Sequence, residues 1–205
     1  MSSGIGKRFG FEDMVSTRRM GSIDSEKGEA MLAAAADILR DEGYAALTSR
    51  RVADYLGVKQ RLVYYYFSTM EELVLECFKR LSRMELARLE KANASDHPLK
   101  EIWDVCYNTV DARLVSEFMA IANRNEAMRE EVIYFIRESR RLQVEMITSA
   151  ITRLNKKYTA LEPELIAFLG TSIALALNRE SSLGIEDGHH EVLKLIDDFF
   201  ASVAP

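Results

Sequence analysis

Residues 48–67 read TSRRVADYLGVKQRLVYYYF, and this stretch predicts two short helices separated by a tight turn. Thr48 can cap the first helix, because its hydroxyl can accept a hydrogen bond from an amide of the open first turn. Val52 and Leu56 then lie four residues apart on one apolar face. Gly57 stands where the chain must reverse, and glycine adopts the left-handed conformation of such a turn at little cost. Two helices joined in this way form a helix-turn-helix, whose second helix docks in a groove of DNA.

The second helix of this motif has two chemically different arcs. Successive residues are about 100° apart around a helix, so residues three and four apart share an arc. One arc is polar, basic and aromatic and comprises Gln60, Arg61, Tyr64 and Tyr65. The opposite arc is apolar and comprises Leu62, Val63 and Phe67, with Tyr66 at the boundary. We therefore expect the first arc to face outward and the second to pack on the protein.

The stretch from Glu29 to Leu73 resembles the DNA-binding domain of the tetracycline-repressor (TetR) family of bacterial regulators. The resemblance rests on an ordered set of residues: Gly43-Tyr44, Thr48, Val52-Ala53, Gly57-Val58, Val63-Tyr64, Phe67 and Glu71-Glu72-Leu73. It implies an all-α protein with an N-terminal three-helix helix-turn-helix DNA-binding domain and a C-terminal helical ligand-binding and dimerisation domain. It also implies a sequence-specific transcriptional regulator, a repressor that a small-molecule effector releases from its operator.

Three positions depart from the pattern of the family. Where the family often has a small hydroxyl residue to cap the recognition helix, this chain has Lys59, which cannot accept the amide bond. The family's usual phosphate-contacting lysine at the start of the following helix is here Met70, and Leu62 stands where a small residue is commoner. These departures concern the details of operator contact rather than the fold.

Composition and periodicity divide the chain into three parts. We expect a flexible N-terminal arm over residues 1–25, the DNA-binding domain over 26–70 and a helical effector-binding and dimerisation domain over 71–205. The predicted helices span 25–42, 70–91, 98–113, 115–124, 126–156, 163–183 and 189–203. The 70–91 helix is long enough to belong to both domains. In the arm, Lys7-Arg8 and Arg18-Arg19 could reach a neighbouring groove, although a functionally silent tail is the simpler interpretation.

The charge distribution reconciles an acidic chain with DNA binding. The net charge of the 205 residues is −5, whereas phosphate contacts need positive charge. Within residues 48–67, however, four basic residues face a single acidic one, Asp54. The basic charge is therefore concentrated on the element that would meet DNA. With neither a membrane span nor an apolar N-terminal signal segment in the sequence, we expect a cytoplasmic protein.

The sequence offers no constellation for catalysis or metal binding. Cys77 and Cys106 stand alone and far apart, so we interpret them as buried free thiols. His189-His190 is the only histidine cluster, and adjacent helical residues point in different directions. The two Glu-x-x-His motifs of a di-metal site, a Gly-x-Ser-x-Gly elbow and a phosphate-binding glycine loop are all lacking. We predict a protein that is not an enzyme and that needs neither cofactor nor metal.

We assign DNA contacts by the chemistry of the outward arc and its neighbours. For base edges or their surroundings the candidates are Gln60, Arg61 and Tyr65, and Arg61 could pair bidentately with guanine. For phosphates the candidates are Thr48, Arg50, Lys59 and Tyr64. Aromatic residues at helical spacing also simply pack in many proteins, which is the alternative for the tyrosines.

The last two helices carry apolar stripes suited to a subunit interface. Gly170 and Ala174 are small residues four apart, which permits close approach of another helix, and the final helix has a matching apolar stripe. In TetR-like proteins these two helices pair with those of a second subunit. We therefore expect a homodimer that reads a palindromic operator in double-stranded DNA. The alternative is that both stripes face the core of the same subunit.

Six residues are candidates for the lining of an effector pocket: Trp103, Tyr107, Phe118, Met119, Asn123 and Asn178. Large apolar surfaces with a few polar groups suit a small-molecule site, but they also describe an ordinary core with satisfied amides. Two further alternatives remain open for the function. The regulator could answer to a protein partner or to no ligand, or the chain could be a helical interaction module that has lost DNA binding.

Overall fold

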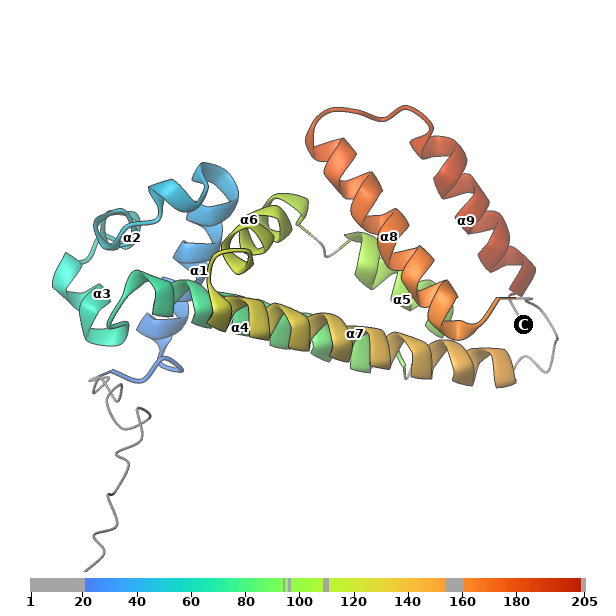
Figure 1. Cartoon of the computed structure of the whole chain (residues 1–205), viewed down its shortest axis with the longest axis horizontal. Helices are drawn as coiled ribbons and strands as arrows, with labels where there is room; N and C mark the ends of the chain where they lie inside the picture. Colours follow the sequence, from blue (N-terminus) through green and yellow to red (C-terminus); the bar gives the residue numbers. More distant parts are fainter. Residues whose placement is uncertain (1–20, 94, 96, 109–110, 154–160, 204–205) are drawn as a thin grey trace, which may run out of the picture.

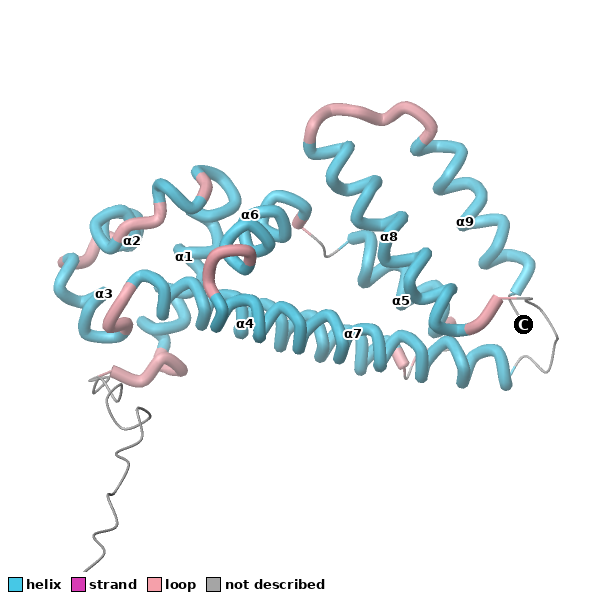
Figure 2. Tube along the Cα trace, viewed as in Figure 1, coloured by secondary structure: helices cyan, strands magenta, loops and turns pink. Residues whose placement is uncertain are grey.

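The structure is a computed structural model that describes residues 21–93, 95, 97–108, 111–153 and 161–203. These residues form helices connected by loops and contain no strand (Figure 2), which confirms the all-α prediction. The elements run, in order, α1 (Glu26–Glu42), the 3-10 helix η2 (Tyr44–Ala46), α2 (Ser49–Leu56), α3 (Gln60–Tyr66), α4 (Met70–Ala92), α5 (Pro98–Asn108), α6 (Ala112–Ala122), α7 (Glu126–Arg153), α8 (Pro163–Ser182) and α9 (His189–Val203).

The helix-turn-helix forms as its sequence predicts. The Thr48 hydroxyl accepts a hydrogen bond of 3.1 Å from the Arg51 amide and so caps α2. Gly57 adopts the left-handed conformation at φ 65° and ψ 31°, which ends α2 and turns the chain toward α3. Val52 and Phe67 are completely or almost completely buried and join the two helices to the core beneath them.

Two long helices connect the ends of the molecule. Figure 1 shows α4 and α7 lying side by side, with α1–α3 at one end and α8 and α9 toward the other. One apolar cluster holds α1–α4 together with α6 and the start of α7, and a second holds the end of α4 with α5, α7 and α8. Helix α4 contributes to both clusters, and α6 packs against the DNA-binding helices. The domain boundary near residue 70 stays a prediction.

Three large apolar residues are exposed. Tyr44 is 41% exposed, whereas Leu47, three residues later, is buried. The reason is that Tyr44 belongs to η2, a single turn that lies on the surface. Met84 in α4 and Ile136 in α7 are also exposed, at 43% and 49%. No helix of the described residues is both long enough and apolar enough to cross a membrane.

Candidate DNA-binding surface and effector cavity

Helix α3 is short and is held in place by its apolar arc. Val63, Tyr66 and Phe67 are buried, and Leu62 packs against the same core. The Lys59 side chain makes no capping bond at the start of α3, as its chemistry predicts. A seven-residue helix with an open N-terminus has little stability of its own. The position of α3 therefore depends on the burial of these side chains.

The opposite arc of α3 faces solvent as predicted. Gln60, Arg61, Tyr64 and Tyr65 are all exposed, and Tyr64 retains 53% of its accessible surface. Gly21 lies close to the rings at the base of this arc, since a Cβ added there would be 2.7 Å from the Tyr65 ring. The chain that precedes α1 therefore passes beside the recognition helix. The arm itself lies mostly outside the described residues.

A serine on α2 links two of the candidate DNA contacts. The Gln60 side-chain amide donates to the Ser49 hydroxyl over 2.8 Å, and that hydroxyl donates to the Tyr64 phenol oxygen over 2.9 Å. Ser49 itself is buried. This relay fixes the directions of Gln60 and Tyr64 before DNA is present. Sequence reasoning missed Ser49, because partners 11 and 15 residues apart on different helices leave no periodic signal.

The basic side chains near α3 fall into two groups. Lys59 and Arg61 have no carboxylate within ion-pair distance among the described residues, and Arg50 lies 3.8 Å from Asp54 with most of its side chain exposed. Arg51, by contrast, donates to both carboxylate oxygens of Glu42, and these bonds hold the pKa of that carboxyl below its usual range. Arg51 thus joins α2 to α1, whereas Arg50, Lys59 and Arg61 are available to phosphates and bases.

The start of α4 explains the Met70 departure. The Thr69 hydroxyl accepts from the Glu72 amide, while the Glu72 carboxylate accepts from the Ser68 amide at 2.7 Å. These bonds satisfy the first turn without any residue that binds phosphate. Met70 packs against the core of the DNA-binding domain. This partly buried side chain therefore packs on the domain instead of presenting a charge to phosphate.

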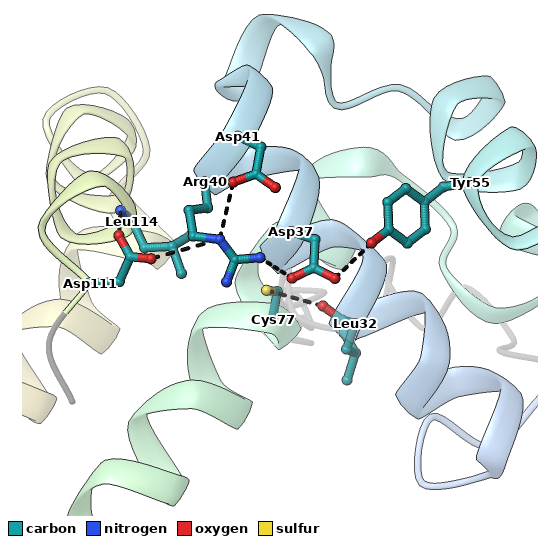
Figure 3. A network of polar contacts seen from close by, with 8 residues as sticks. All are labelled: Leu32, Asp37, Arg40, Asp41, Tyr55, Cys77, Asp111 and Leu114. Atoms are coloured by element: carbon teal, nitrogen blue, oxygen red, sulfur yellow. Dashed lines mark hydrogen bonds and ion pairs between the residues drawn. The ribbon is translucent and has the colours of Figure 1, made fainter. Parts of the chain in front are cut away.

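Helix α6 connects the C-terminal half to the DNA-binding helices by polar contacts. Asp111 caps α6 through the Leu114 amide and lies 3.8 Å from Arg40 of α1. Arg40 pairs in turn with Asp37, and Asp37 accepts a bond of 2.9 Å from the Tyr55 hydroxyl of α2 (Figure 3). At the other end of this contact, the Glu117 carboxylate of α6 accepts from the Tyr44 amide at 3.0 Å. A shift of α6 would therefore pull on both α1 and α2.

An apolar cavity of about 300 Å³, here called the inner cavity, lies between α4, α5, α6, α7 and α8. Its apolar walls include Phe78 and Leu89 of α4, Val115, Phe118 and Met119 of α6, and Val132 and Phe135 of α7. The polar residues that line it are Glu85, Ser139, Arg140, Gln143 and Thr171. Its volume is at the lower end of the range for small-molecule sites. The cavity touches both α4 and α6, the helices that reach the DNA-binding domain.

A second cavity of about 390 Å³, here called the outer cavity, opens between α5, α8 and α9. A polar partition separates it from the inner cavity: Thr171 donates to the Gln143 amide oxygen at 3.0 Å, and the Gln143 nitrogen donates to Ser139 at 3.1 Å. Much of its wall is exposed, including Leu195 at 70%. A wider groove of about 850 Å³ beside η2 and α6 is lined by several carboxylates, Glu42, Glu71 and Glu117 among them.

Residues 31–77 match the model of the bacterial regulatory proteins of the tetR family. The HTH-type transcriptional repressor KstR2 of Mycobacterium tuberculosis is 29% identical over 140 residues, which cover 68% of this chain and 64% of the length of that protein. The N-terminal helices of the chain therefore form a DNA-binding domain of the TetR type.

Solved structures share the TetR fold over most of the chain. A TetR transcription regulator from Haloarcula marismortui superposes with a TM-score of 0.68 at 20% identity, covering 86% of this chain and 95% of that one. A regulator from Saccharomonospora viridis, solved in complex with choline, gives 0.67 at 13% identity and covers 76% and 85%. Identities this low show the fold alone.

The effector residues predicted for this chain are distributed over different sites. Phe118 and Met119 line the inner cavity, and Trp103 lines the outer one. Tyr107 stacks on Trp103 with ring centroids 5.4 Å apart and lines neither cavity. Asn123 is exposed at the end of α6, and the Asn178 amide donates to the Tyr107 carbonyl oxygen at 2.8 Å. The structure therefore does not bring these six side chains into one pocket. Asn123 stands at the C-terminal end of α6, and Asn178 joins α8 to α5.

The two cysteines and His189 are buried inside the protein. Cys77 and Cys106 are both buried, and the Cys77 thiol donates to the Leu32 carbonyl oxygen at 3.5 Å. His189 is buried beside the Glu180 carboxylate at 3.1 Å. Over the described residues, no group of three or more His, Cys, Asp or Glu side chains is placed to hold a metal ion.

Proposed function

We propose that this chain is a transcriptional repressor that binds a palindromic operator as a homodimer and leaves it when a small molecule fills the inner cavity. The observation that carries the proposal is the outer arc of α3. There an exposed amide, two exposed phenols and a guanidinium that has no acidic partner among the described residues project together from a TetR-type helix-turn-helix. Such an arc combines donors for base edges with charge for the phosphate backbone.

The roles on this surface follow from reach and chemistry. Gln60, Arg61 and Tyr65 are assigned to base edges, since they project from the exposed arc of α3. Thr48, Arg50, Lys59 and Tyr64 are assigned to phosphates. The bonds that Thr48 and Tyr64 accept within the protein leave their hydroxyl protons free to donate. Pre-orientation by Ser49 lowers the entropy lost when Gln60 and Tyr64 meet DNA.

Exposed apolar side chains on α8 and α9 support the homodimer. Leu165, Phe168 and Leu169 follow a helical spacing on α8 and are 41% to 58% exposed, and Leu195 of α9 is 70% exposed. Water-exposed leucine and phenylalanine at this density mark a protein interface more often than a free surface. Gly170 lies beside this row, and a Cβ placed there would meet nothing within 4 Å. A second subunit would cover this face and the outer cavity.

Effector release follows from the two helices that the inner cavity shares with the DNA-binding domain. A ligand between Phe78 of α4 and Phe118 of α6 can separate these helices, whose rings are now in edge-to-face contact at 5.1 Å. Helix α6 would transmit the shift through Asp111 to Arg40 and through Glu117 to Tyr44. In a dimer, small rotations of both DNA-binding domains change the distance between the two recognition helices. Operator affinity falls only as far as the ligand prefers the released state.

Selection of bound sequences from random duplexes tests the proposal directly. We expect enrichment of an inverted repeat with half-site centres about one helical turn, or a multiple of it, apart. A dimer-breaking variant should lose the enrichment. Failure of the intact protein to enrich any inverted repeat would overturn operator binding and favour the interaction-module alternative. Retained operator binding through a broad metabolite screen would instead favour a regulator that answers to a protein or to nothing.

A further inference from the structure

The inner cavity contains one cationic donor without a hydrogen-bond partner. Arg140 of α7 lines the cavity, and its Nη1 atom is buried and makes no hydrogen bond to any residue that the structure describes. Within the described residues, the only other buried side-chain nitrogen or oxygen in this condition is the Ser82 hydroxyl. Burying a donor of a charged group without a partner is costly, so the hydrogen-bonding capacity of Arg140 Nη1 is unused within the protein.

The surroundings of Arg140 do not compensate for this loss. Its guanidinium carbon lies 5.2 Å from the centre of the Phe168 ring, and such a contact attracts the charge without accepting the missing N–H bond. Burial lowers the pKa of the guanidinium from its ordinary value, although arginine stays charged at neutral pH. The charge is therefore present, and its Nη1 donor has no hydrogen-bond partner among the described residues.

The other polar groups of the cavity are already engaged. Glu85, the one carboxylate in the lining, lies 3.5 Å from Arg88. Ser139, Gln143 and Thr171 bond to one another in the partition. Arg140 is thus the group with unused hydrogen-bonding capacity that faces an otherwise apolar space.

The remaining walls set the shape of the ligand. Phe78 is in edge-to-face contact with Phe118 at 5.1 Å and with Phe135 at 6.1 Å, and Leu89 and Val132 complete an apolar surface. At roughly 30 Å³ for each water-sized unit, a cavity of about 300 Å³ holds on the order of ten non-hydrogen atoms.

We propose that the inner cavity binds an apolar monocarboxylate of medium length, with the carboxylate on Arg140 and the tail against the phenylalanine rings. A carboxylate can accept a hydrogen bond from Arg140 Nη1 and oppose the partly buried charge in one contact. An amine would face a cation, and a neutral ligand would leave the charge uncompensated. The inference rests on the proposed function only in calling this ligand the effector.

Octanoate, which has ten non-hydrogen atoms, is the first probe, and octanamide is its neutral match. Calorimetric titration of the DNA-free protein should show octanoate binding at least about tenfold more tightly than octanamide, because a charge-assisted bond is lost with the amide. Arg140→Ala should abolish this preference. Arg137→Ala, an exposed arginine one turn earlier on α7, should retain it. Circular dichroism identifies variants that do not fold. If Arg140→Ala does not fold, the difference between octanoate and octanamide binding to the wild type still tests the proposal.

Three outcomes would overturn the carboxylate site. These are equal binding of octanoate and octanamide to the wild type, no binding of any straight-chain carboxylate from hexanoate to dodecanoate, or a carboxylate preference that survives Arg140→Ala. The operator assay is separate. If octanoate binds at Arg140 without weakening operator binding, the site is confirmed and its regulatory role is contradicted. If the titration shows no binding while operator binding is intact, the carboxylate site is rejected and the DNA-binding proposal is unaffected.

Discussion

The carboxylate of Asp111 lies 3.8 Å from Arg40 Nε. This pair joins the N-cap residue of α6 to α1, the helix that supports the helix-turn-helix. Arg40 continues the contact to Asp37, and Asp37 to Tyr55 on α2 (Figure 3). Because the inner cavity is walled partly by α6, the pair lies between the proposed ligand and the proposed DNA surface. Substitutions of Asp111 can remove its charge while keeping the hydrogen bonds by which it caps α6.

Asp111→Asn should retain the helix cap and lose the ion pair. Asparagine caps helices about as well as aspartate, so the free energy of unfolding should change by less than about 1 kcal/mol, while Asp111→Ala should cost about 1 kcal/mol through the lost cap. Chemical denaturation measures both values. With octanoate as ligand, the loss of operator affinity should be smaller for Asp111→Asn than for the wild type. An unchanged response, equal to that of the exposed control Glu130→Gln, would show that coupling does not pass through this pair.

Arg61→Ala and Lys59→Ala should weaken DNA binding in different ways. Arg61 is assigned to a base edge, so its loss should cost about 1–3 kcal/mol on the selected operator and relax the preference at one position of each half-site. Lys59 is assigned to a phosphate, so its loss should weaken operator and random duplexes alike and reduce the salt dependence by about one ion per subunit. Equal effects of both variants on both kinds of DNA would remove this division of roles.

The sequence predicted the helix-turn-helix well because local chemistry determines it. Thr48, Gly57 and the two arcs of α3 each act over a few residues, where capping, left-handed turns and helical spacing give direct signals. The effector cavity could not be predicted in the same way. Arg140 and Ser139 stood in an apparently ordinary long helix, and only packing against α4, α6 and α8 reveals that one faces a cavity and the other a polar partition.

Gly57→Ala should destabilise the protein through the backbone alone. Gly57 has φ 65°, but a Cβ there would touch nothing within 4 Å, so the cost of about 1–2 kcal/mol comes from the left-handed conformation. Gly57→Asn should cost less, because asparagine tolerates this conformation better. The denaturation midpoint should therefore be lower for Gly57→Ala than for Gly57→Asn, and both should be lower than that of the wild type.

Leu169→Asp should convert the proposed dimer to a monomer. Leu169 is 41% exposed on α8, and burying a carboxylate there in a subunit interface would cost its desolvation. Sedimentation velocity should show half the mass of the wild type, and binding to a palindromic operator should be lost while the helix content stays unchanged. Tyr134→Asp, at 61% exposure on α7, is the control that should leave the mass unchanged. A wild-type protein that sediments as a monomer would contradict the dimer before any variant is made.

Both cysteines should resist alkylation in the folded protein. Burial raises the pKa of Cys77 to about 12 and that of Cys106 to about 11. Since the pKa values are raised, both groups are neutral thiols at pH 8, and only about one Cys106 side chain in a thousand is the reactive thiolate at that pH. Iodoacetamide at pH 8 should therefore modify neither residue until denaturant exposes them, as mass spectrometry can follow. Rapid labelling of Cys106 alone in native buffer would mean that the inner cavity, which this thiol lines, opens to solvent far more often than its packing indicates.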